Sequence, residues 1–164
     1  MTLCYLGLGS NLNSPERQLR QAISALRQLP DTQLYKVASF YRSKAWGRKA
    51  QPHFCNTAVA LKTTLTPQRL LSLCKKIEHQ QGRIRKIRWG ARTLDIDILL
   101  YGTVEVYSQT LQIPHPRLHE RHFVFIPLLE IASQPIMIDG VELRTLVAER
   151  GYNLCSLEFK LQLD

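Results

Sequence analysis

Hydrophobic and polar positions recur with two different periods along this chain, and these periods predict the order of its elements. Leu3 to Leu8 is apolar on both faces, as in a strand buried within a sheet. From Leu19 to Leu29 the apolar residues recur at helical spacing, after Ser14 as an expected cap and Pro15 as the first helical residue. The chain is therefore predicted to open with a strand followed by an amphipathic helix.

The next three elements follow from the same reasoning. Thr32 to Tyr41 is rich in β-branched and aromatic residues and predicts a second strand, and Phe54 to Lys62 alternates and predicts a third. Thr66 to Gln81 begins with a Thr-Pro pair and predicts a second amphipathic helix. Strict alternation of apolar residues and aspartates from Leu94 to Ile98, in a stretch that ends at Tyr101, predicts a fourth strand.

The resulting β-α-β-β-α-β order is typical of the ferredoxin-like split βαβ arrangement, so the predicted fold class is α+β. Both helices would then lie on one side of a four-stranded sheet. Beyond it, Val104 to Ile113 predicts a two-stranded excursion, and short helical turns are expected at Arg117 to Arg121 and Val124 to Ile131. A strand at Ile136 to Ile138 and a helix from Glu142 to Arg150 end the fold. This C-terminal helical extension is expected to cover the other face, giving a three-layer α/β/α arrangement.

Length and composition fit one soluble domain, predicted to span residues 1–164. The net charge of +9 indicates anionic partners, without choosing between nucleic acid, lipid and phosphorylated small molecules. The four cysteines form no CxxC pair and predict reduced, mostly buried thiols. No signal peptide is expected, and the longest apolar run, Phe123 to Leu129, is too short to span a bilayer. A cytoplasmic location is therefore expected.

The densest group of charged candidate site residues lies between Gly82 and Tyr101. The first half of this stretch carries five cations and no acid: Arg83, Arg85, Lys86, Arg88 and Arg92. In its second half Asp95 and Asp97 alternate with apolar residues, so both carboxylates lie on one face of the strand. A polyanion would bind the first half and a divalent metal the second. A nucleoside triphosphate with magnesium would use both.

The paired aspartates leave two interpretations open. Asp95 and Asp97 would lie ~7 Å apart along the strand, where they can pair with the neighbouring arginines or face solvent. Alternatively they bind magnesium, which prefers one or two carboxylates together with water and phosphate oxygens. Two such ions, ~3.5–4 Å apart, would hold a transferring phosphoryl group and its leaving group.

Other familiar site patterns are disfavoured. The Gly-x-Gly fragment at 7–9 lacks the third glycine of a dinucleotide fingerprint, and no GxxxxGK[ST] loop occurs. A zinc site built from His115, His119 and His122 would need a helix, which the prolines on both sides of His115 exclude. His115 is better placed to hydrogen-bond a phosphate or a ribose.

Single polar and aromatic residues also leave alternatives open. Trp46, in a cationic loop, is either tucked under the loop or binds a flat ligand. Phe54 and Asn56 share one strand face, either as a core aromatic beside a packed face or as a shallow floor for a planar heterocycle. Glu78 lies on the flank of the buried stripe of its helix, where a solvated glutamate is the commoner outcome.

The stretch from Arg88 to Leu99, Arg-Trp-Gly-Ala-Arg-Thr-Leu-Asp-Ile-Asp-Ile-Leu, resembles the signature of the 6-hydroxymethyl-7,8-dihydropterin pyrophosphokinases of folate biosynthesis. Four shorter blocks resemble the family's other motifs in the right order: Gly9 to Leu12, Phe40 to Ser43, Glu78 to Arg83 and Pro114 to Leu118. The resemblance implies transfer of an intact pyrophosphoryl group from ATP to the pterin hydroxymethyl oxygen, releasing AMP.

The resemblance also implies roles for individual residues. Two magnesium ions would bind Asp95 and Asp97, and Arg83 and Arg92 would stabilise phosphate charge. The implied ATP contacts are Glu78, Arg85, Arg88, Trp89, Ile98, His115 and Arg121. The implied pterin contacts are Ser43, Lys44, Trp46, Phe54, Asn56 and Phe123. The pterin would stack between the two phenylalanines, and the loop from Arg83 to Ala91 would close as a lid over MgATP.

Two alternative functions compete with this enzyme. An RNA-binding module would suit the sheet and the charge, but it predicts exposed aromatics on the central strands, where this chain has Leu-Gly-Leu-Gly and Asn-Thr-Ala-Val-Ala. A catalytically dead relative is disfavoured because both aspartates and the signature arginine are present. A monomer without nucleic-acid or membrane partners is expected.

Overall fold

The computed structural model describes residues 1–43, 54–82 and 93–151. The N-terminal elements are β1 (Thr2–Ser10), α1 (Pro15–Arg27), β2 (Thr32–Val37), β3 (Tyr41–Ser43), β4 (Phe54–Thr63), α2 (Pro67–Gln80) and β5 (Asp95–Tyr101). The C-terminal elements are β6 (Val106–Tyr107), β7 (Gln112–Ile113), α3 (His122–Ile131), β8 (Met137–Ile138), β9 (Val141–Glu142) and α4 (Leu143–Glu149).

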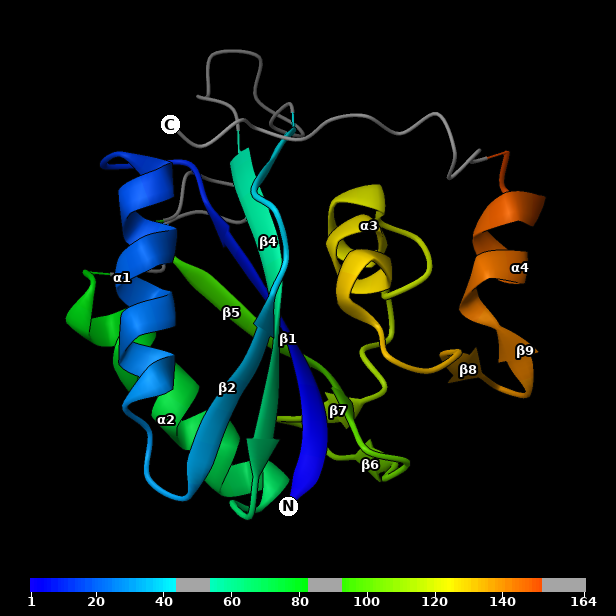
Figure 1. Cartoon of the computed structure of the whole chain (residues 1–164), viewed down its shortest axis with the longest axis horizontal. Helices are drawn as coiled ribbons and strands as arrows, with labels where there is room; N and C mark the ends of the chain where they lie inside the picture. Colours follow the sequence, from blue (N-terminus) through cyan, green and yellow to red (C-terminus); the bar gives the residue numbers. More distant parts are fainter. Residues whose placement is uncertain (44–53, 83–92, 152–164) are drawn as a thin grey trace.

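The described strands build one main sheet in the order β2-β4-β1-β5, with β3 also paired to β4. Every pairing in this sheet is antiparallel. The helices α1 and α2 cover one face, α3 covers the other, and α4 lies beyond α3 (Figure 1). The molecule is thus a mixed α/β fold with an antiparallel sheet between helices, which confirms the predicted class and layering.

The face of the sheet that α1 and α2 cover is apolar. Alternate strand residues such as Leu6, Leu8 and Val59 are buried there with Leu26 of α1 and Leu70 of α2. Each of these side chains is fully or almost fully removed from solvent. Burial of this face supplies the larger of the two hydrophobic clusters and fixes the register of the strands.

The opposite face has a smaller cluster made with α3. Ala58 and Ala60 of β4 lie in it with Phe125 and Leu128 of the helix. The β1–β5 pairing shifts register beside Tyr5, and Leu99 has no paired residue there. Both Leu99 and Leu100 belong to this cluster, although they are neighbours in the strand. At the other end of the same face the strands carry glycine, asparagine and aspartate.

The predicted second strand, Thr32 to Tyr41, is wrong near its C-terminal end, because Ala38 to Phe40 separates β2 from β3. Ala38 N–H still donates to the Ala58 carbonyl at 2.8 Å. The Thr57 hydroxyl, however, contacts the carbonyls of Ala38 and Ser39 at 3.1 and 3.0 Å. At this break the hydroxyl of Thr57 therefore binds the carbonyls that backbone N–H groups of a neighbouring strand would otherwise bind.

The two helix starts behave differently, although both have a hydroxyl residue before proline. Thr66 caps α2 as expected, since its hydroxyl accepts from the Arg69 N–H at 3.2 Å. Ser14 makes no such bond and adopts the left-handed conformation, with φ 60°. The prediction of a capping hydroxyl at Ser14 is therefore wrong, and the start of α1 is marked by Pro15 and by Glu16 in the first turn.

The C-terminal extension departs from the prediction in detail. The helical turn expected from Val124 begins at His122 and contains Pro127, and a further strand, β9, precedes α4. Asp139 and Gly140 form the expected turn, both with positive φ, between β8 and β9. The excursion predicted between 104 and 113 is confirmed as β6 and β7.

Two of the compositional predictions can be compared with the structure. Cys4, Cys55 and Cys74 are free and buried, as expected, while Cys155 lies outside the described residues. No helix within the described ranges is long and apolar enough to cross a membrane.

Candidate active site

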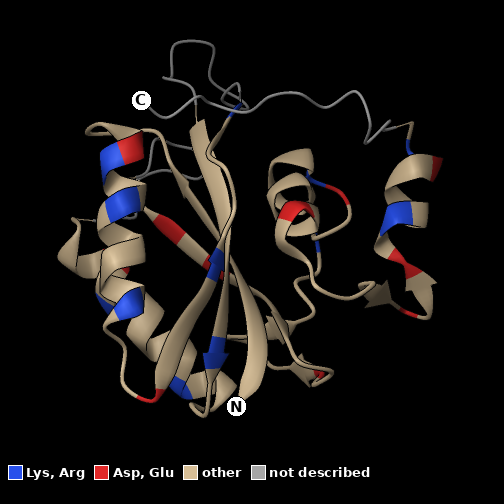
Figure 2. Ribbon diagram, in the orientation of Figure 1, with Lys and Arg blue, Asp and Glu red and all other residues tan. Residues whose placement is uncertain are grey.

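Asp95 and Asp97 open β5, and the residues opposite them in β1 are glycines. Asp95 pairs with Gly9 and Asp97 with Gly7, so each carboxylate has no side chain beside it on the β1 side. Both aspartates are partly exposed, whereas Ile96 between them is buried on the other face. They are the red segments of β5 in Figure 2. The strand therefore holds two carboxylates side by side in an open part of the sheet.

Gly9 also determines where Asn56 lies. These residues pair across β1 and β4, and the Asn56 Oδ1 atom would lie 2.7 Å from a Cβ atom built on Gly9. Only glycine lets the amide approach the strand backbone so closely. Asn56 is 6 % exposed, so its amide is held in place at the edge of the core.

The outer edge of β5, away from β1, carries two further predicted site residues. Glu78 of α2 accepts a hydrogen bond from the Ile96 N–H through Oε2 at 2.9 Å. His115 donates its backbone N–H to the Leu99 carbonyl at 3.0 Å. Glu78 and His115, far apart in sequence, thus both contact the strand that bears the aspartates.

The expectation that Glu78 is a solvated glutamate is wrong. Its side chain is 4 % exposed and lies on the buried stripe of α2 one turn after Cys74. A buried carboxylate requires hydrogen-bond donors, and the backbone N–H between the two aspartates is one of them. Glu78 therefore links α2 to the centre of the acidic segment of β5.

His115 follows the cis peptide bond between Ile113 and Pro114, and its ring is oriented by the chain that follows it. The Arg117 N–H donates to His115 Nδ1 at 3.2 Å, so a neutral ring carries its proton on Nε2. Burial and the nearby Arg121 and Arg117 lower the pKa of His115, while Asp95 opposes this change. His115 is thus set up as a neutral Nε2–H donor near an aspartate.

Arg121 lies immediately before α3 and takes part in the same electrostatic group. Burial and Arg117 lower its pKa, whereas Asp97 and Asp95 raise it. Its guanidinium carbon is 5.9 Å from the centre of the Phe123 ring. Arg121 therefore lies within electrostatic reach of both carboxylates and beside the aromatic ring of α3.

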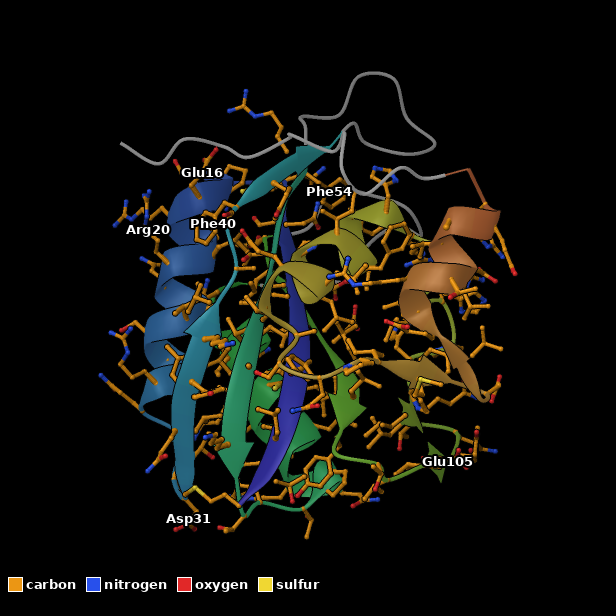
Figure 3. All side chains as sticks on the ribbon, turned by 45° about the vertical axis from the view of Figure 1, so that its right-hand side comes forward. Glu16, Arg20, Asp31, Phe40, Phe54 and Glu105 are labelled. Atoms are coloured by element: carbon orange, nitrogen blue, oxygen red, sulfur yellow. The ribbon has the colours of Figure 1, made fainter. Side chains whose placement is uncertain are left out.

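The aromatic residues proposed for the pterin lie on the face that α3 covers. Phe54 and Asn56 alternate in β4 with residues of the opposite core, and α3 packs on β4. Phe123 lies in the first turn of α3, in edge-on contact with His122. Figure 3 shows Phe54 at the end of β4, on the side of the sheet where α3 lies. Both rings are partly exposed.

The donor set fits magnesium and not a metal held by protein ligands alone. No group of three His, Cys, Asp or Glu residues within the described ranges is arranged to hold a metal. Two carboxylates beside glycines leave room for water and phosphate oxygens, which Mg²⁺ prefers as its remaining ligands. Asp95 and Asp97 are accordingly the residues that can hold it.

Several predicted site residues cannot be placed against this geometry. Outside the described residues lie Lys44, Trp46, Arg83, Arg85, Arg88, Trp89 and Arg92. Ser43 pairs with Phe54 through the backbone. The Ile98 side chain is 3 % exposed in the cluster under α1 and α2, so a contact of Ile98 with a nucleotide would come from its backbone.

Sequence reasoning missed two contributors to this site. Gly9 belongs to the Gly9 to Leu12 block, but its close approach to Asn56 depends on a strand pairing that sequence does not reveal. Arg117 was not selected, although it binds the His115 ring through its N–H and adds positive charge beside Arg121. Its position two residues after a Pro-His-Pro turn was the available signal.

Comparison with known proteins gives independent evidence. Residues 5–133 match the family model of 7,8-dihydro-6-hydroxymethylpterin-pyrophosphokinase (HPPK). A 2-amino-4-hydroxy-6-hydroxymethyldihydropteridine pyrophosphokinase of Haemophilus influenzae is 44% identical over 149 residues, which cover 91% of this chain and 93% of that protein. Its Bacillus subtilis counterpart is also 44% identical, over 80% of this chain and 79% of its own length.

Solved structures of low sequence identity share the fold. The Plasmodium falciparum HPPK-DHPS bound to pteroate superimposes with a TM-score of 0.69 at 13% identity over 91% of this chain. An HPPK-DHPS in complex with substrates gives 0.67 at 11% identity over 92%. This chain spans 42% and 45% of those two longer chains. By its family match and by the identity of its relatives, the chain belongs to the 7,8-dihydro-6-hydroxymethylpterin-pyrophosphokinase family.

Proposed function

We propose that this protein transfers the pyrophosphoryl group of ATP to the hydroxymethyl oxygen of 6-hydroxymethyl-7,8-dihydropterin, a step of folate biosynthesis. The observation that carries this proposal is the pair Asp95 and Asp97, presented beside two glycines in a chain that matches the family over residues 5–133. The comparisons give no support to an RNA-binding module.

The reaction needs no protein nucleophile. The hydroxymethyl oxygen attacks the β-phosphorus of ATP, and the bond from that phosphorus to the oxygen bridging the α- and β-phosphates breaks. This oxygen leaves with AMP, and the hydroxyl proton is released to solvent. The protein therefore has to align the reactants and stabilise the phosphate charge.

Phosphate binding falls to the acidic strand and its neighbours. Asp95 and Asp97 would hold two magnesium ions, which neutralise phosphate charge and polarise the transferred group when bound. His115, neutral with its proton on Nε2, would donate to a phosphate oxygen, and Arg121 would add a guanidinium fork. Arg83 and Arg92 remain proposed for the transferring group, with Arg85, Arg88 and Trp89 as further nucleotide contacts.

The pterin would lie on the face covered by α3. The Asn56 amide offers both a donor and an acceptor to the heterocycle, and its approach to Gly9 fixes their directions. Phe54 and Phe123 would stack on the two sides of the ring system. Ser43, Lys44 and Trp46 remain proposed as contacts of the neighbouring loop.

Further proposals concern the whole molecule. The strand order β2-β4-β1-β5, with α1 and α2 on one face, supports a ferredoxin-like core, and clusters on both faces of one sheet support a single domain over 1–164. We also propose a cytoplasmic monomer that binds neither nucleic acid nor membranes.

The test is product analysis with ATP, magnesium and 6-hydroxymethyl-7,8-dihydropterin. We expect AMP and the pterin diphosphate in equal amounts, and neither product without magnesium. Formation of ADP and a pterin monophosphate would overturn the pyrophosphoryl assignment. Formation of AMP without a modified pterin would overturn the acceptor.

A further inference from the structure

Glu130, near the C-terminal end of α3, joins this helix to the break between β2 and β3. Its Oε2 atom accepts from the Ser39 N–H and its Oε1 atom from the Ser39 hydroxyl, each at 2.5 Å. The Tyr41 side chain is hydrogen-bonded to the same carboxylate. Both oxygens of one glutamate thus bind a segment some ninety residues earlier in the chain.

The segment that Glu130 binds is itself held firmly. Ala38 is anchored to the Ala58 carbonyl, and Thr57 contacts the two carbonyls at 38 and 39. Ser39 lies between the registers of β2 and β3, so its N–H is directed to the helix and not to a strand. The break is therefore a fixed attachment point on the sheet.

A row of residues paired across neighbouring strands leads from Tyr41, beside the break, into the proposed site. Tyr41 pairs with Asn56, Asn56 with Gly9, and Gly9 with Asp95. Burial and Glu130 raise the pKa of Tyr41 to about 12, so its hydroxyl stays protonated as a donor. The residue that Glu130 contacts is thus the immediate neighbour of the asparagine proposed to bind the pterin.

Several polar bonds hold the C-terminal end of α3 against the sheet. Beside those of Glu130, Ser133 donates its N–H to the Tyr5 hydroxyl at 3.2 Å, and the Lys36 ammonium donates to the Ser133 hydroxyl at 3.3 Å. The middle of the helix packs on Ala58 and Ala60, whose small side chains present a smooth surface. Small side chains let the helix lie close to β4, and the hydrogen bonds of Glu130 add a directional constraint to this packing.

Phe123 lies at the other end of the same side of the helix. Glu130 follows it by seven positions, which places the two on one face about 10 Å apart along the axis. Pro127 lacks the N–H that would bind the Phe123 carbonyl, so this turn has one backbone bond fewer. The placement of Phe123 therefore depends on where the body of α3 is held.

We propose that Glu130, through Ser39 and Tyr41, is a positioning residue that fixes α3 over β4 and thereby sets the distance between Phe123 and the strand face bearing Phe54 and Asn56. This role rests on the proposed function, in which the pterin lies between these residues. Among the described nucleotide contacts only Arg121, the residue before α3, would move with the helix, so Glu130 would act mainly on the affinity for the pterin.

The test is the Glu130→Gln variant, which keeps the size of the side chain but replaces one acceptor oxygen with an NH₂ group. At saturating MgATP we expect the KM for the pterin to rise about five- to tenfold. The Kd for MgATP, measured by calorimetry without pterin, should change by less than about twofold. Glu149→Gln on α4 is the matched control, since Glu149 is exposed on another helix, and it should change neither constant.

A double-mutant cycle with Ser39→Ala identifies the contact responsible. The double variant should raise the KM no further than Glu130→Gln alone, because the one bond that Ser39→Ala removes, from its hydroxyl to the carboxylate, is already disrupted by Glu130→Gln. Additive effects would overturn the assignment of Ser39 as the partner. A parallel loss of pterin and nucleotide affinity in Glu130→Gln would show a merely structural role and overturn the proposal.

Phe123→Ala separates this inference from the proposed function. If Phe123→Ala weakens pterin binding while Glu130→Gln leaves it unchanged, the positioning role alone is wrong. If Phe123→Ala itself leaves the pterin KM unchanged, the proposed pterin site is wrong and the inference fails with it.

Discussion

Leu8 and Gly9 are neighbours in β1, yet they face opposite sides of the sheet and two different environments. Leu8 is 2 % exposed among the apolar side chains under α1 and α2. Gly9 lies on the other face, between Asn56 and Asp95. Because side chains alternate along a strand, one backbone supplies a dry core to one face and a polar surface to the other.

This difference separates stability from chemistry within the same strands. The face under α1 and α2 buries large apolar residues, and the resulting free energy of folding fixes the strand register. With the register fixed, the other face can carry glycines and carboxylates that contribute little to stability. Substitutions on the two faces should therefore have different consequences, even at adjacent positions.

The largest effect is expected from Asp97→Asn. This change keeps the shape of the side chain but removes a charge that magnesium requires, so turnover should fall at least about a thousandfold, about 4 kcal/mol in the barrier. AMP release measured over a range of magnesium concentrations tests this. The circular dichroism spectrum and the unfolding midpoint should stay close to those of the wild type. Unchanged AMP release would contradict the metal assignment.

Sequence was sufficient for the parts of this site that follow from local pattern. The alternation around Asp95 and Asp97 predicted two carboxylates on one face, and the Thr66-Pro67 pair predicted the start of α2 correctly. Local pattern failed where a distant partner decides the outcome. Glu78 reads as a flank position on a helical wheel, but the Ile96 N–H of another element makes it a buried residue.

The same limit explains the break at Ala38 to Phe40. The stretch from Thr32 to Tyr41 as a whole is rich in strand-forming residues, so sequence predicts a continuous strand, yet Thr57 and Glu130 bind the backbone of the break from other elements. Ser14 illustrates the converse, since its motif predicts a cap while its left-handed backbone directs the hydroxyl elsewhere. Tertiary contacts override propensity at Ala38 to Phe40, whereas at Ser14 the local backbone conformation does so.

Leu8→Ala tests the apolar face. Truncating a buried leucine should lower the free energy of unfolding by about 3 kcal/mol, through lost burial and the cavity left behind. Denaturant unfolding measures this loss. At a temperature where the variant remains folded, its KM values for both substrates should stay within about twofold of the wild type. A large rise in either KM would show that the two faces are not independent.

Gly9→Ala tests the polar face one residue further on. An added Cβ would lie 2.7 Å from Asn56 Oδ1, so the amide must turn away from the position it holds. We expect the KM for the pterin to rise about tenfold, about 1.4 kcal/mol, with a smaller change in stability than for Leu8→Ala. Steady-state kinetics at saturating MgATP measure the effect.

Gly7→Ala is the matched control for this variant. There the nearest neighbour of an added Cβ is the flexible side chain of Leu99, at 3.4 Å, which can yield. Its effect on the pterin KM should be clearly smaller than that of Gly9→Ala. Equal effects would mean that the loss comes from the strand backbone and not from Asn56.

The smallest effect is expected for thiol modification. It tests whether solvent reaches the apolar face of the sheet at the end of β4 nearest the proposed site. Cys55 lies between Phe54 and Asn56 but faces the opposite side, and burial raises its pKa to about 12, with Glu16 acting in the same direction. Burial likewise raises the pKa of Cys4 and of Cys74 to about 12. At pH 8 only about one such thiol in ten thousand is ionised, and the thiolate is the reactive form.

In a Cys155→Ser variant, iodoacetamide should therefore leave the native protein unmodified for hours, while mass spectrometry should find three modified cysteines after denaturation. Selective modification of Cys55 in the native protein would show that solvent reaches the apolar face beside the proposed pterin site. The two faces of the sheet would then not be separated at the end of β4 that bears Phe54 and Asn56.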